Sequence, residues 1–205
     1  DSAPIRPKDR FLVFGAPAIE DAEIEAVVAT MRSGWLGTGP QTALFEQEIA
    51  RYKQSPHAIA LNSCTAALHL SLLASGIGPG DEVVTTPMTF CATVNAIIHA
   101  GATPVLADVD PVSMNIDPQA VAAAVTARTR AILPVHFAGR PCRMDDLLAI
   151  ASRHRLKMIE DCAHAIETEY HGRPVGTFGD FGCLSFYVTK NIITGEGGMV
   201  LTRSE

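Results

Sequence analysis

The amino-acid sequence predicts an α/β protein with a mostly parallel sheet flanked by helices. Short apolar runs alternate along the chain with segments whose apolar residues recur at helical spacing. Most of these runs are continuously apolar, which is typical of strands buried on both faces. Turn sequences such as GIGPGD (76–81) and VDP (109–111) separate the units.

The elements are expected in a regular order. Two helical patterns come first, IEDAEIEAVVATMRS (19–33) and TALFEQEIARYK (42–53). Short apolar runs follow, and longer segments of helical spacing lie between most of them. The predicted strands are 57–61, 82–86, 103–107, 130–135, 156–160, 182–186 and 198–202, and the predicted helices among them are 65–75, 89–100, 118–127 and 144–155.

The two ends of the chain differ from this pattern. Residues 1–18 contain three prolines, and we expect them to form an extended arm in front of one domain that covers 19–205. The chain stops directly after the last predicted strand, with no closing helix. We interpret the domain as incomplete at its C-terminal end.

Composition argues against several classes of protein. The net charge is −6 and the 16 basic residues are scattered, so no basic patch for nucleic acid is expected. An odd number of cysteines without C-x-x-C spacing predicts free thiols in a reducing compartment. These are Cys64, Cys91, Cys142, Cys162 and Cys183. Because neither a signal-like run nor a bilayer-length apolar stretch occurs, a cytoplasmic location is expected.

The first candidate site follows the strand at 57–61. Small residues, Asn62-Ser63-Cys64-Thr65, lead there into a helix. A helix N-terminus offers free backbone N–H groups and a favourable dipole, so this turn is a candidate phosphate site. Ser63 or Thr65 can equally act as a simple N-cap, and the two interpretations are compatible.

A second candidate, Asp161, ends the strand at 156–160. A carboxylate at the end of a buried strand must be paired or serve a purpose, because desolvating it is costly. The structural alternative is an Asp that caps a turn or meets an arginine, such as Arg173 or Arg130. Cys162 and His164 nearby raise the possibility of a metal, but no second pair at ligand spacing exists, so no metal is expected.

The third candidate is Lys190, in the stretch SFYVTKNIITGEGG (185–198). The chain has only four lysines, and the other three fall in the arm (Lys8), beside acidic residues on a helix (Lys53) and at a strand start (Lys157). Lys190 alone follows a core strand among apolar neighbours. Lost solvation lowers the pKa of such an amine and makes it a nucleophile and base. The alternative is an ordinary surface lysine on a loop.

Together, a phosphate site, a strand-end carboxylate and a desolvated lysine are the groups that pyridoxal 5′-phosphate (PLP) requires. Its aldehyde binds a lysine, its ring nitrogen needs an acidic partner, and its phosphate suits a helix N-terminus. The glycine clusters GTGP and GEGG match neither the Walker A motif nor the dinucleotide fingerprint.

Seven ordered motifs carry a resemblance to a known family. The chain resembles, from about Phe14 to Glu205, the DegT/DnrJ/StrS family of PLP-dependent nucleotide-sugar aminotransferases. The motifs are SGWLGTGP (33–40), NSCTAALHL (62–70), GIGPGDEV (76–83), PMTFCATVNAIIHAGATPVLADVD (87–110), PVHFAG (134–139), IEDCAHAIE (159–167) and SFYVTKNIITGEGG (185–198). The resemblance implies the three-layer large domain of the aspartate-aminotransferase fold (fold type I), with a smaller C-terminal domain missing here.

The resemblance also implies roles for individual residues. Lys190 would hold PLP as an internal aldimine and then move the substrate proton, while Asp161 would pair with the pyridinium nitrogen. His164 would lie near the phenolic oxygen. Phe90 would stack on one face of the ring and Ala163 would pack against the other.

Further implied contacts concern the phosphate and the substrate. Cys64, Thr65 and Ala66, together with Ser185, would bind the phosphate, and Thr38 would approach the substrate. Cys64 stands where the family often has glycine or another small residue. Substrate contacts usually come from the part of the family's chains that lies beyond Glu205, and from the partner subunit.

The reaction implied is the transfer of an amino group from an amino acid, with glutamate as the expected donor, to a keto sugar nucleotide. Members that aminate a 4-keto sugar look similar, pyridoxamine phosphate would be the intermediate, and a homodimer with shared sites is expected. Members that dehydrate sugars replace the lysine with histidine, so Lys190 argues against that branch.

Two alternatives stay open. One is another fold type I enzyme, a lyase or a cysteine desulfurase. A desulfurase needs an exposed, mobile cysteine, whereas four cysteines lie in or beside buried-looking elements and Cys142, in a loop, has no activator. The other is a non-catalytic regulatory homologue, against which the retained Lys190, Asp161 and His164 argue.

Overall fold

One seven-stranded sheet organises the molecule, with strand order β1-β9-β8-β5-β4-β2-β3. The structure is a computed structural model and describes residues 15–203. The strands of this sheet are β1 (His57–Leu61), β2 (Glu82–Thr85), β3 (Thr103–Leu106), β4 (Thr129–Leu133), β5 (Lys157–Asp161), β8 (Phe181–Ser185) and β9 (Gly198–Thr202). The small strands β6 (Glu169–Tyr170) and β7 (Arg173–Pro174) form a separate hairpin.

The helices agree with the predicted segments to within a few residues. They are α1 (Asp21–Ser33), α2 (Pro40–Tyr52), α3 (Cys64–Ala74), α4 (Cys91–His99), α5 (Pro118–Ala124) and α6 (Met144–His154), with a short 3-10 turn, η1, at Phe137–Gly139. The predicted arm at 1–18 falls mostly outside the described residues. None of the helices in the described part is long and apolar enough to cross a membrane.

The sheet is mostly parallel, as predicted. Strands β3, β2, β4, β5 and β8 pair in parallel, whereas β9 runs antiparallel to both of its neighbours, β1 and β8. Because β9 returns directly beside β8, the connecting segment 186–197 lies at the carboxyl end of β8. The carboxyl ends of the parallel strands lie at this same edge.

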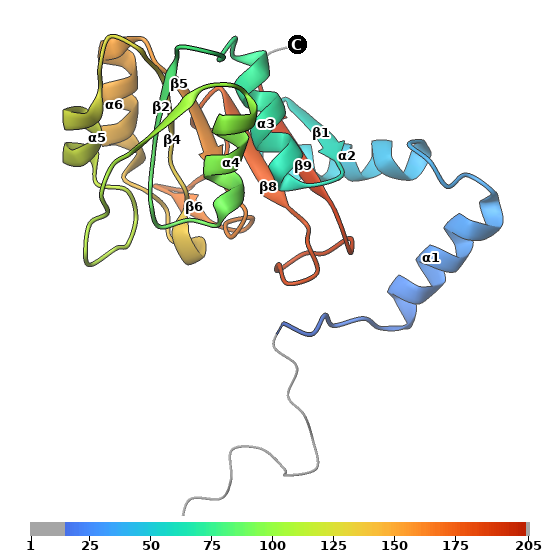
Figure 1. Ribbon diagram of the computed structural model, residues 1–205. Helices are drawn as coiled ribbons and strands as arrows, with labels where there is room; N and C mark the ends of the chain where they lie inside the picture. Colours follow the sequence, from blue (N-terminus) through green and yellow to red (C-terminus); the bar gives the residue numbers. More distant parts are fainter. Residues whose placement is uncertain (1–14, 204–205) are drawn as a thin grey trace, which may run out of the picture.

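Both faces of the sheet are buried, which explains the continuous apolar runs. Successive side chains of a strand point to opposite faces, so Val83 and Ile159 join one core cluster, while Val84 and Met158 join another. Helices α3 and α4 cover the first face and lie in front of the strands in Figure 1. Helices α2, α5 and α6 cover the other face. The three-layer α/β architecture is thus confirmed.

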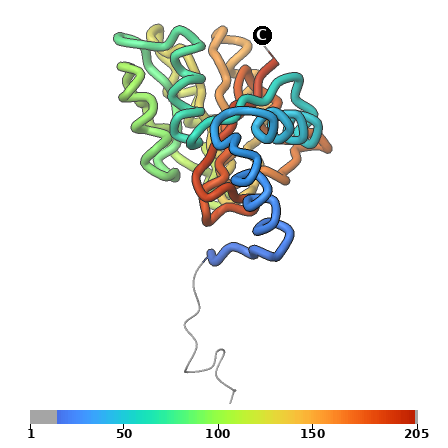
Figure 2. The backbone as a smooth tube through the Cα atoms, turned by 90° about the vertical axis from the view of Figure 1, so that its right-hand side faces the viewer, coloured from blue at the N-terminus to red at the C-terminus, as the bar shows by residue number. Residues whose placement is uncertain are grey.

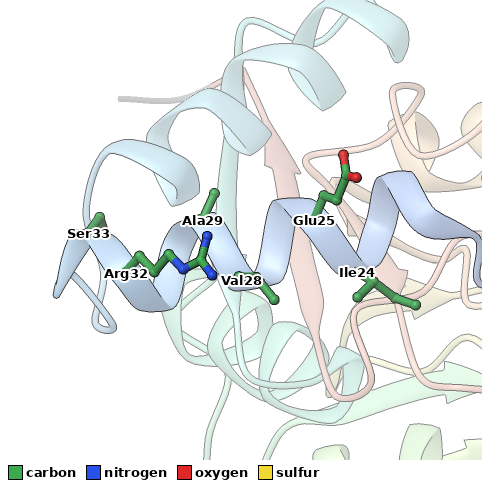
Figure 3. A pocket seen from close by; sticks show the side chains of 6 residues that line it. All are labelled: Ile24, Glu25, Val28, Ala29, Arg32 and Ser33. Carbon is green, nitrogen blue, oxygen red and sulfur yellow. The ribbon is translucent and has the colours of Figure 1, made fainter.

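Helix α1 stands off from this body (Figures 1 and 2). It has no buried residue, and Ile24, Val27 and Met31 are all more than half exposed. A pocket of about 700 Å³ lies along this helix (Figure 3). Its lining comes from α1 alone: Ile24, Glu25, Val28, Ala29, Arg32 and Ser33. This pocket is a feature of an uncovered helix face, and none of its lining residues is among the candidate site residues named above.

Two expectations about exposure are wrong. Lys53, expected beside acidic residues on a helix surface, is fully buried, and its Nζ donates a 2.7 Å hydrogen bond to the carbonyl of Ile166. Its aliphatic stem reaches inward from the end of α2. Cys91, expected in or beside a buried element, is exposed at the start of α4. All five cysteines are free, as predicted.

The buried amine predicts a pH-dependent stability. Burial lowers the pKa of Lys53 below its usual 10.5, although Cys162 and Glu160 oppose this. The unfolded chain therefore binds more protons than the folded protein between the two pKa values, and stability rises with pH across that window. We expect the free energy of unfolding of wild type, minus that of Lys53→Met, to increase as pH rises toward 10.5.

Urea unfolding at a series of pH values measures this difference. Lys157→Met is the matched control, because it removes an exposed lysine that pairs with Asp180. The same pH dependence in both variants would contradict the role assigned to the buried Lys53 amine.

Candidate active site

Asp161 is the most deeply buried charged residue of the candidate site. It ends β5 and is only 4% exposed. Thr93 Oγ1 donates a 2.8 Å hydrogen bond to its Oδ2, and the Ala163 amide donates one of 3.1 Å to its Oδ1. An ionised carboxylate offers about four acceptor positions. Asp161 therefore keeps acceptor capacity for a further donor.

The structural alternative for Asp161 holds in one part: its side chain caps the turn after β5 through the Ala163 amide, whereas both arginines bind elsewhere. Arg130 forms an ion pair with Asp81 at 3.2 Å. Arg173 lies over the Phe178 ring and bonds to Thr177. Asp161 thus accepts hydrogen bonds from neutral donors, and neither arginine forms an ion pair with it.

Lys190 is half-buried in the segment that joins β8 to β9. Burial lowers the pKa of its amine, while the nearby Cys64 and Asp161 act to raise it. The net direction is downward, as the sequence predicted. The same two partners place the amine close to both the β5 end and the start of α3.

His164 belongs to the same group, although its side chain is exposed. Partial burial and the Lys190 charge lower its pKa, and Asp161 acts in the opposite direction. A neutral imidazole can donate or accept one hydrogen bond beside the amine and the carboxylate. The structure thus brings Lys190, Asp161 and His164 together.

The N-terminus of α3 forms the third part of the site. Ser63 is the N-cap, and its side chain accepts a 3.1 Å hydrogen bond from the Ala66 amide, so the capping interpretation is confirmed. The amides of Cys64 and Thr65, in the first turn, have no acceptor within an α-helix and remain suited to an anion.

Strand β9 packs directly against the N-terminus of α3. A Cβ on Gly198 would lie 2.1 Å from the Ser63 carbonyl carbon and 2.3 Å from the Cys64 nitrogen. Ser185 is the partner of Gly198 in the β8–β9 register. Ser185 therefore lies next to the start of α3, where the phosphate contact was predicted.

Phe90 and Ala163, the two residues expected to face the cofactor ring, differ in their exposure. Phe90 precedes α4 as its N-cap and is 77% exposed, which is unusual for so large an apolar ring. Ala163 is half-buried, two residues beyond Asp161. Both follow strands whose carboxyl ends lie at the same edge of the sheet.

Thr38 is not brought to this group. It lies in the loop between α1 and α2, at the outer right of Figure 1. Its carbonyl accepts a 3.1 Å hydrogen bond from Trp35 Nε1. Among the contacts of residues 15–203, none joins Thr38 to Asp161 or Lys190.

Sequence reasoning missed Thr89 and Thr93. Thr93 is 1% exposed on α4, and its hydroxyl lies 2.7 Å from that of Thr89. A signal was present, since Thr93 is a polar residue on the apolar face of the helix. Its partner, Asp161, is 68 residues away in sequence. No local pattern predicts such a pairing.

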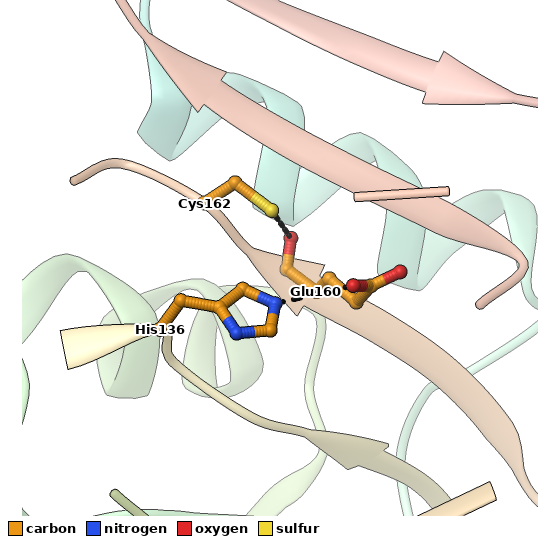
Figure 4. A group of neighbouring side chains, drawn as sticks. All are labelled: His136, Glu160 and Cys162. Atoms are coloured by element: carbon orange, nitrogen blue, oxygen red, sulfur yellow. Dashed lines mark hydrogen bonds and ion pairs between the residues drawn. The ribbon is translucent and has the colours of Figure 1, made fainter. Parts of the chain in front are cut away.

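A second buried acid, Glu160, lies on the opposite face of β5 (Figure 4). With His136 and Cys162 it forms a group whose ligand atoms lie within 4.8 Å of one another. The carboxylate oxygens of Glu160 and both ring nitrogens of His136 are nonetheless in use. Glu160 accepts hydrogen bonds from His136 and from the amides of Gly176, Phe178 and Gly179, and His136 Nδ1 accepts one from the Cys142 amide.

These bonds explain the ionisation of Glu160. Burial acts to raise its pKa, but the hydrogen bonds from His136 and from the Gly176 and Gly179 amides outweigh burial, so the pKa is lowered. A metal would have to break several of these bonds. We interpret the group as a structural brace between β5 and the 176–179 turn.

The donor set of the site fits the cofactor predicted from the sequence. An amine of lowered pKa, a buried carboxylate with spare acceptor capacity, a helix N-terminus and an uncovered aromatic ring lie along one edge of the sheet. These correspond to the aldehyde, the ring nitrogen, the phosphate and the ring face of PLP.

Comparison with known proteins identifies the family. A sequence model of the DegT/DnrJ/EryC1/StrS aminotransferase family matches residues 17–205, and the chain belongs to this family. The chain is 52% identical over 201 residues to the spore coat polysaccharide biosynthesis protein SpsC of Bacillus subtilis (strain 168), covering 98% of this chain and 52% of that protein.

Solved structures agree with this assignment. An aminotransferase from Psychrobacter cryohalolentis superposes with a TM-score of 0.90 at 43% identity, over 92% of this chain and 49% of the other. Spr1654 from Streptococcus pneumoniae, in its PLP form, gives a TM-score of 0.91 at 37% identity, over 95% of this chain and 53% of the other. The chain thus spans about half the length of these relatives.

The contact between β9 and α3 predicts the effect of Gly198→Ala. The added Cβ must displace backbone on both sides, so we expect a loss of about 1–3 kcal/mol in the free energy of unfolding. PLP should also bind more weakly, because the displaced atoms belong to the start of α3. Gly78→Ala is the control, since its Cβ would meet nothing closer than the Ala100 carbonyl at 3.9 Å.

Thermal unfolding and PLP titration measure the two effects separately. A destabilised Gly198→Ala protein with unchanged PLP affinity would show that the phosphate binds somewhere other than the start of α3.

Proposed function

We propose that the full-length protein is a PLP-dependent aminotransferase that moves an amino group from an amino acid to a keto sugar nucleotide in amino-sugar biosynthesis. The observation that carries this proposal is the convergence of Lys190, Asp161 and the start of α3 at one edge of the sheet. Family membership and the similarity to SpsC support the reaction class.

The cofactor supplies, when bound, an aldehyde that combines with amines and a ring that withdraws electrons. Asp161 holds a proton at the ring nitrogen with its spare acceptor capacity. The amides of Cys64 and Thr65, with the Ser185 hydroxyl, bind the phosphate. Ala66 shapes this turn, and its own amide is engaged by Ser63.

Lys190 is the group that moves protons. Because its pKa is lowered, a larger fraction of the amine is neutral near pH 7 than for an ordinary lysine, and a neutral amine accepts a proton from the substrate carbon. His164 would lie beside the phenolic oxygen of the bound cofactor and orient the ring. Phe90 and Ala163 would cover the two ring faces and exclude water from them.

The finer assignments follow the family resemblance. We propose glutamate as the donor, a 4-keto sugar nucleotide as the acceptor, a homodimer with shared sites, and action in the cytoplasm. Residues 19–205 would then be the cofactor-binding large domain, and Thr38 would approach the substrate only when other parts of the full-length enzyme close over the site. Cys91 is exposed but fixed in the first turn of α4, which does not fit the mobile nucleophile of a desulfurase.

Absorption spectroscopy of the full-length enzyme tests this proposal. Wild type loaded with PLP should show the visible band of the lysine-bound cofactor and lose it on addition of glutamate. Lys190→Ala should lack this band and lose amination of a keto sugar nucleotide by about 10³-fold or more, because proton transfer needs the amine. Lys157→Ala, which removes an exposed lysine, is the control and should behave like wild type.

Two other outcomes would reject parts of the proposal. A visible band that no amino acid discharges would indicate a different PLP reaction. The absence of any band with added PLP would reject the cofactor itself and favour a non-catalytic homologue.

A further inference from the structure

We propose that Thr93 is a positioning residue that keeps the proton shared by Asp161 and the cofactor ring nitrogen on that nitrogen. Thr89 supports Thr93 by donating a hydrogen bond to its hydroxyl. This inference rests on the role proposed above for Asp161. It concerns two residues that lie within the motif at 87–110 but received no role from the sequence, and it starts from a hydrogen-bonded series of three side chains, Thr89, Thr93 and Asp161.

The direction of this chain follows from counting protons. Thr93 Oγ1 donates to Asp161 Oδ2 at 2.8 Å. A hydroxyl has one proton, so the 2.7 Å contact between Thr89 and Thr93 must have Thr89 as its donor. Each hydroxyl therefore polarises the next, and the chain ends on the carboxylate.

The second carboxylate oxygen is held from a different element. The Ala163 amide donates to Oδ1 at 3.1 Å. Asp161 is thus fixed from α4 on one side and from the turn after β5 on the other, and both partners are donors. Donors stabilise the ionised carboxylate and disfavour its protonated form.

A purely structural explanation fits Thr93 less well than other hydroxyl groups in the molecule. Buried hydroxyls on helices usually bond to the carbonyl four residues earlier. The buried Ser71 on α3 bonds in this way to the Ala67 carbonyl, and the partly exposed Thr30 on α1 does so to that of Ala26. Thr93 is 1% exposed, and its hydroxyl reaches across to β5.

The consequence for the bound cofactor concerns one proton. This proton lies between the ring nitrogen and Asp161, and no other bond forms or breaks. The bond donated by Thr93 occupies Oδ2 of Asp161 and suits a carboxylate that carries no proton on that oxygen, so the proton would stay on the ring, where it would make the ring a stronger electron acceptor. Without the Thr93 hydroxyl, the proton shifts toward Asp161.

The test uses the full-length enzyme loaded with PLP that carries ¹⁵N in its ring. The ¹⁵N chemical shift reports protonation of that nitrogen directly. In Thr93→Val we expect the resonance to move toward the unprotonated value and kcat to fall roughly tenfold or more, as for loss of one hydrogen bond to a charged group. Thr93→Ser should restore both, and Thr89→Val should cause a smaller shift in the same direction.

Ser71→Ala is the matched control, because it removes a buried hydroxyl whose partners, the Ala67 carbonyl and Cys183 Sγ, do not include Asp161. A resonance that stays at the wild-type position in Thr93→Val overturns the proposal. Should Thr93→Val not retain the cofactor, Thr89→Val decides: a displaced resonance supports the chain, and an unchanged one overturns it.

The ¹⁵N measurement requires no keto sugar, so the two proposals fail separately. Amination by wild type with an unchanged Thr93→Val resonance would reject the role of Thr93 alone. A displaced resonance in an enzyme that aminates no keto sugar would reject the proposed function alone.

Discussion

The carboxyl end of β5 places two acids in succession, Glu160 and Asp161, both almost completely buried. Adjacent residues of a strand face opposite sides of a sheet, so one carboxylate enters each helical layer. A buried charge is tolerated only where hydrogen bonds replace its lost water. Much of the surrounding structure can be understood as the provision of those bonds.

The two acids are satisfied to different degrees, and this difference separates structure from function. Glu160 receives four donors, three of them backbone amides, which use all its acceptor positions. It holds β5 against the 176–179 turn and has nothing left to offer a ligand. Asp161 receives two donors from the protein and keeps the remainder for a group that enters from the edge of the sheet.

Most of the fold was predictable from sequence because its signals are local. Apolar runs bounded by turns gave the seven main strands to within a residue or two, but such runs carry no information about direction, so the antiparallel β9 was not predicted. The β6–β7 hairpin was missed because strands of two residues show no periodicity. Asp161 and Lys190 were found because both follow buried strands, where charged residues are rare.

The features that sequence did not predict all depend on contacts between distant segments. Lys53 can be buried because the Ile166 carbonyl, 113 positions away, accepts a hydrogen bond from its Nζ, and the Glu160 brace joins three separate segments, 136–142, β5 and 176–179. The same reasoning explains why Thr93 was overlooked while its partner was recognised. Local pattern identifies a residue that needs a partner, whereas only the folded chain identifies the partner.

The two principal groups of the site also differ in how firmly they are held. Asp161 lies on a central strand, with both carboxylate oxygens hydrogen-bonded, so its position is fixed before any ligand arrives. Lys190 lies on the segment between β8 and β9, where its own amide bonds to the Tyr187 carbonyl and its side chain is only half-buried. Under the proposed function, a group that tunes the cofactor ring would have to stay still, whereas an amine that first binds the cofactor and then carries a proton would have to move. The fold supplies a rigid strand for the first task and a connecting segment for the second.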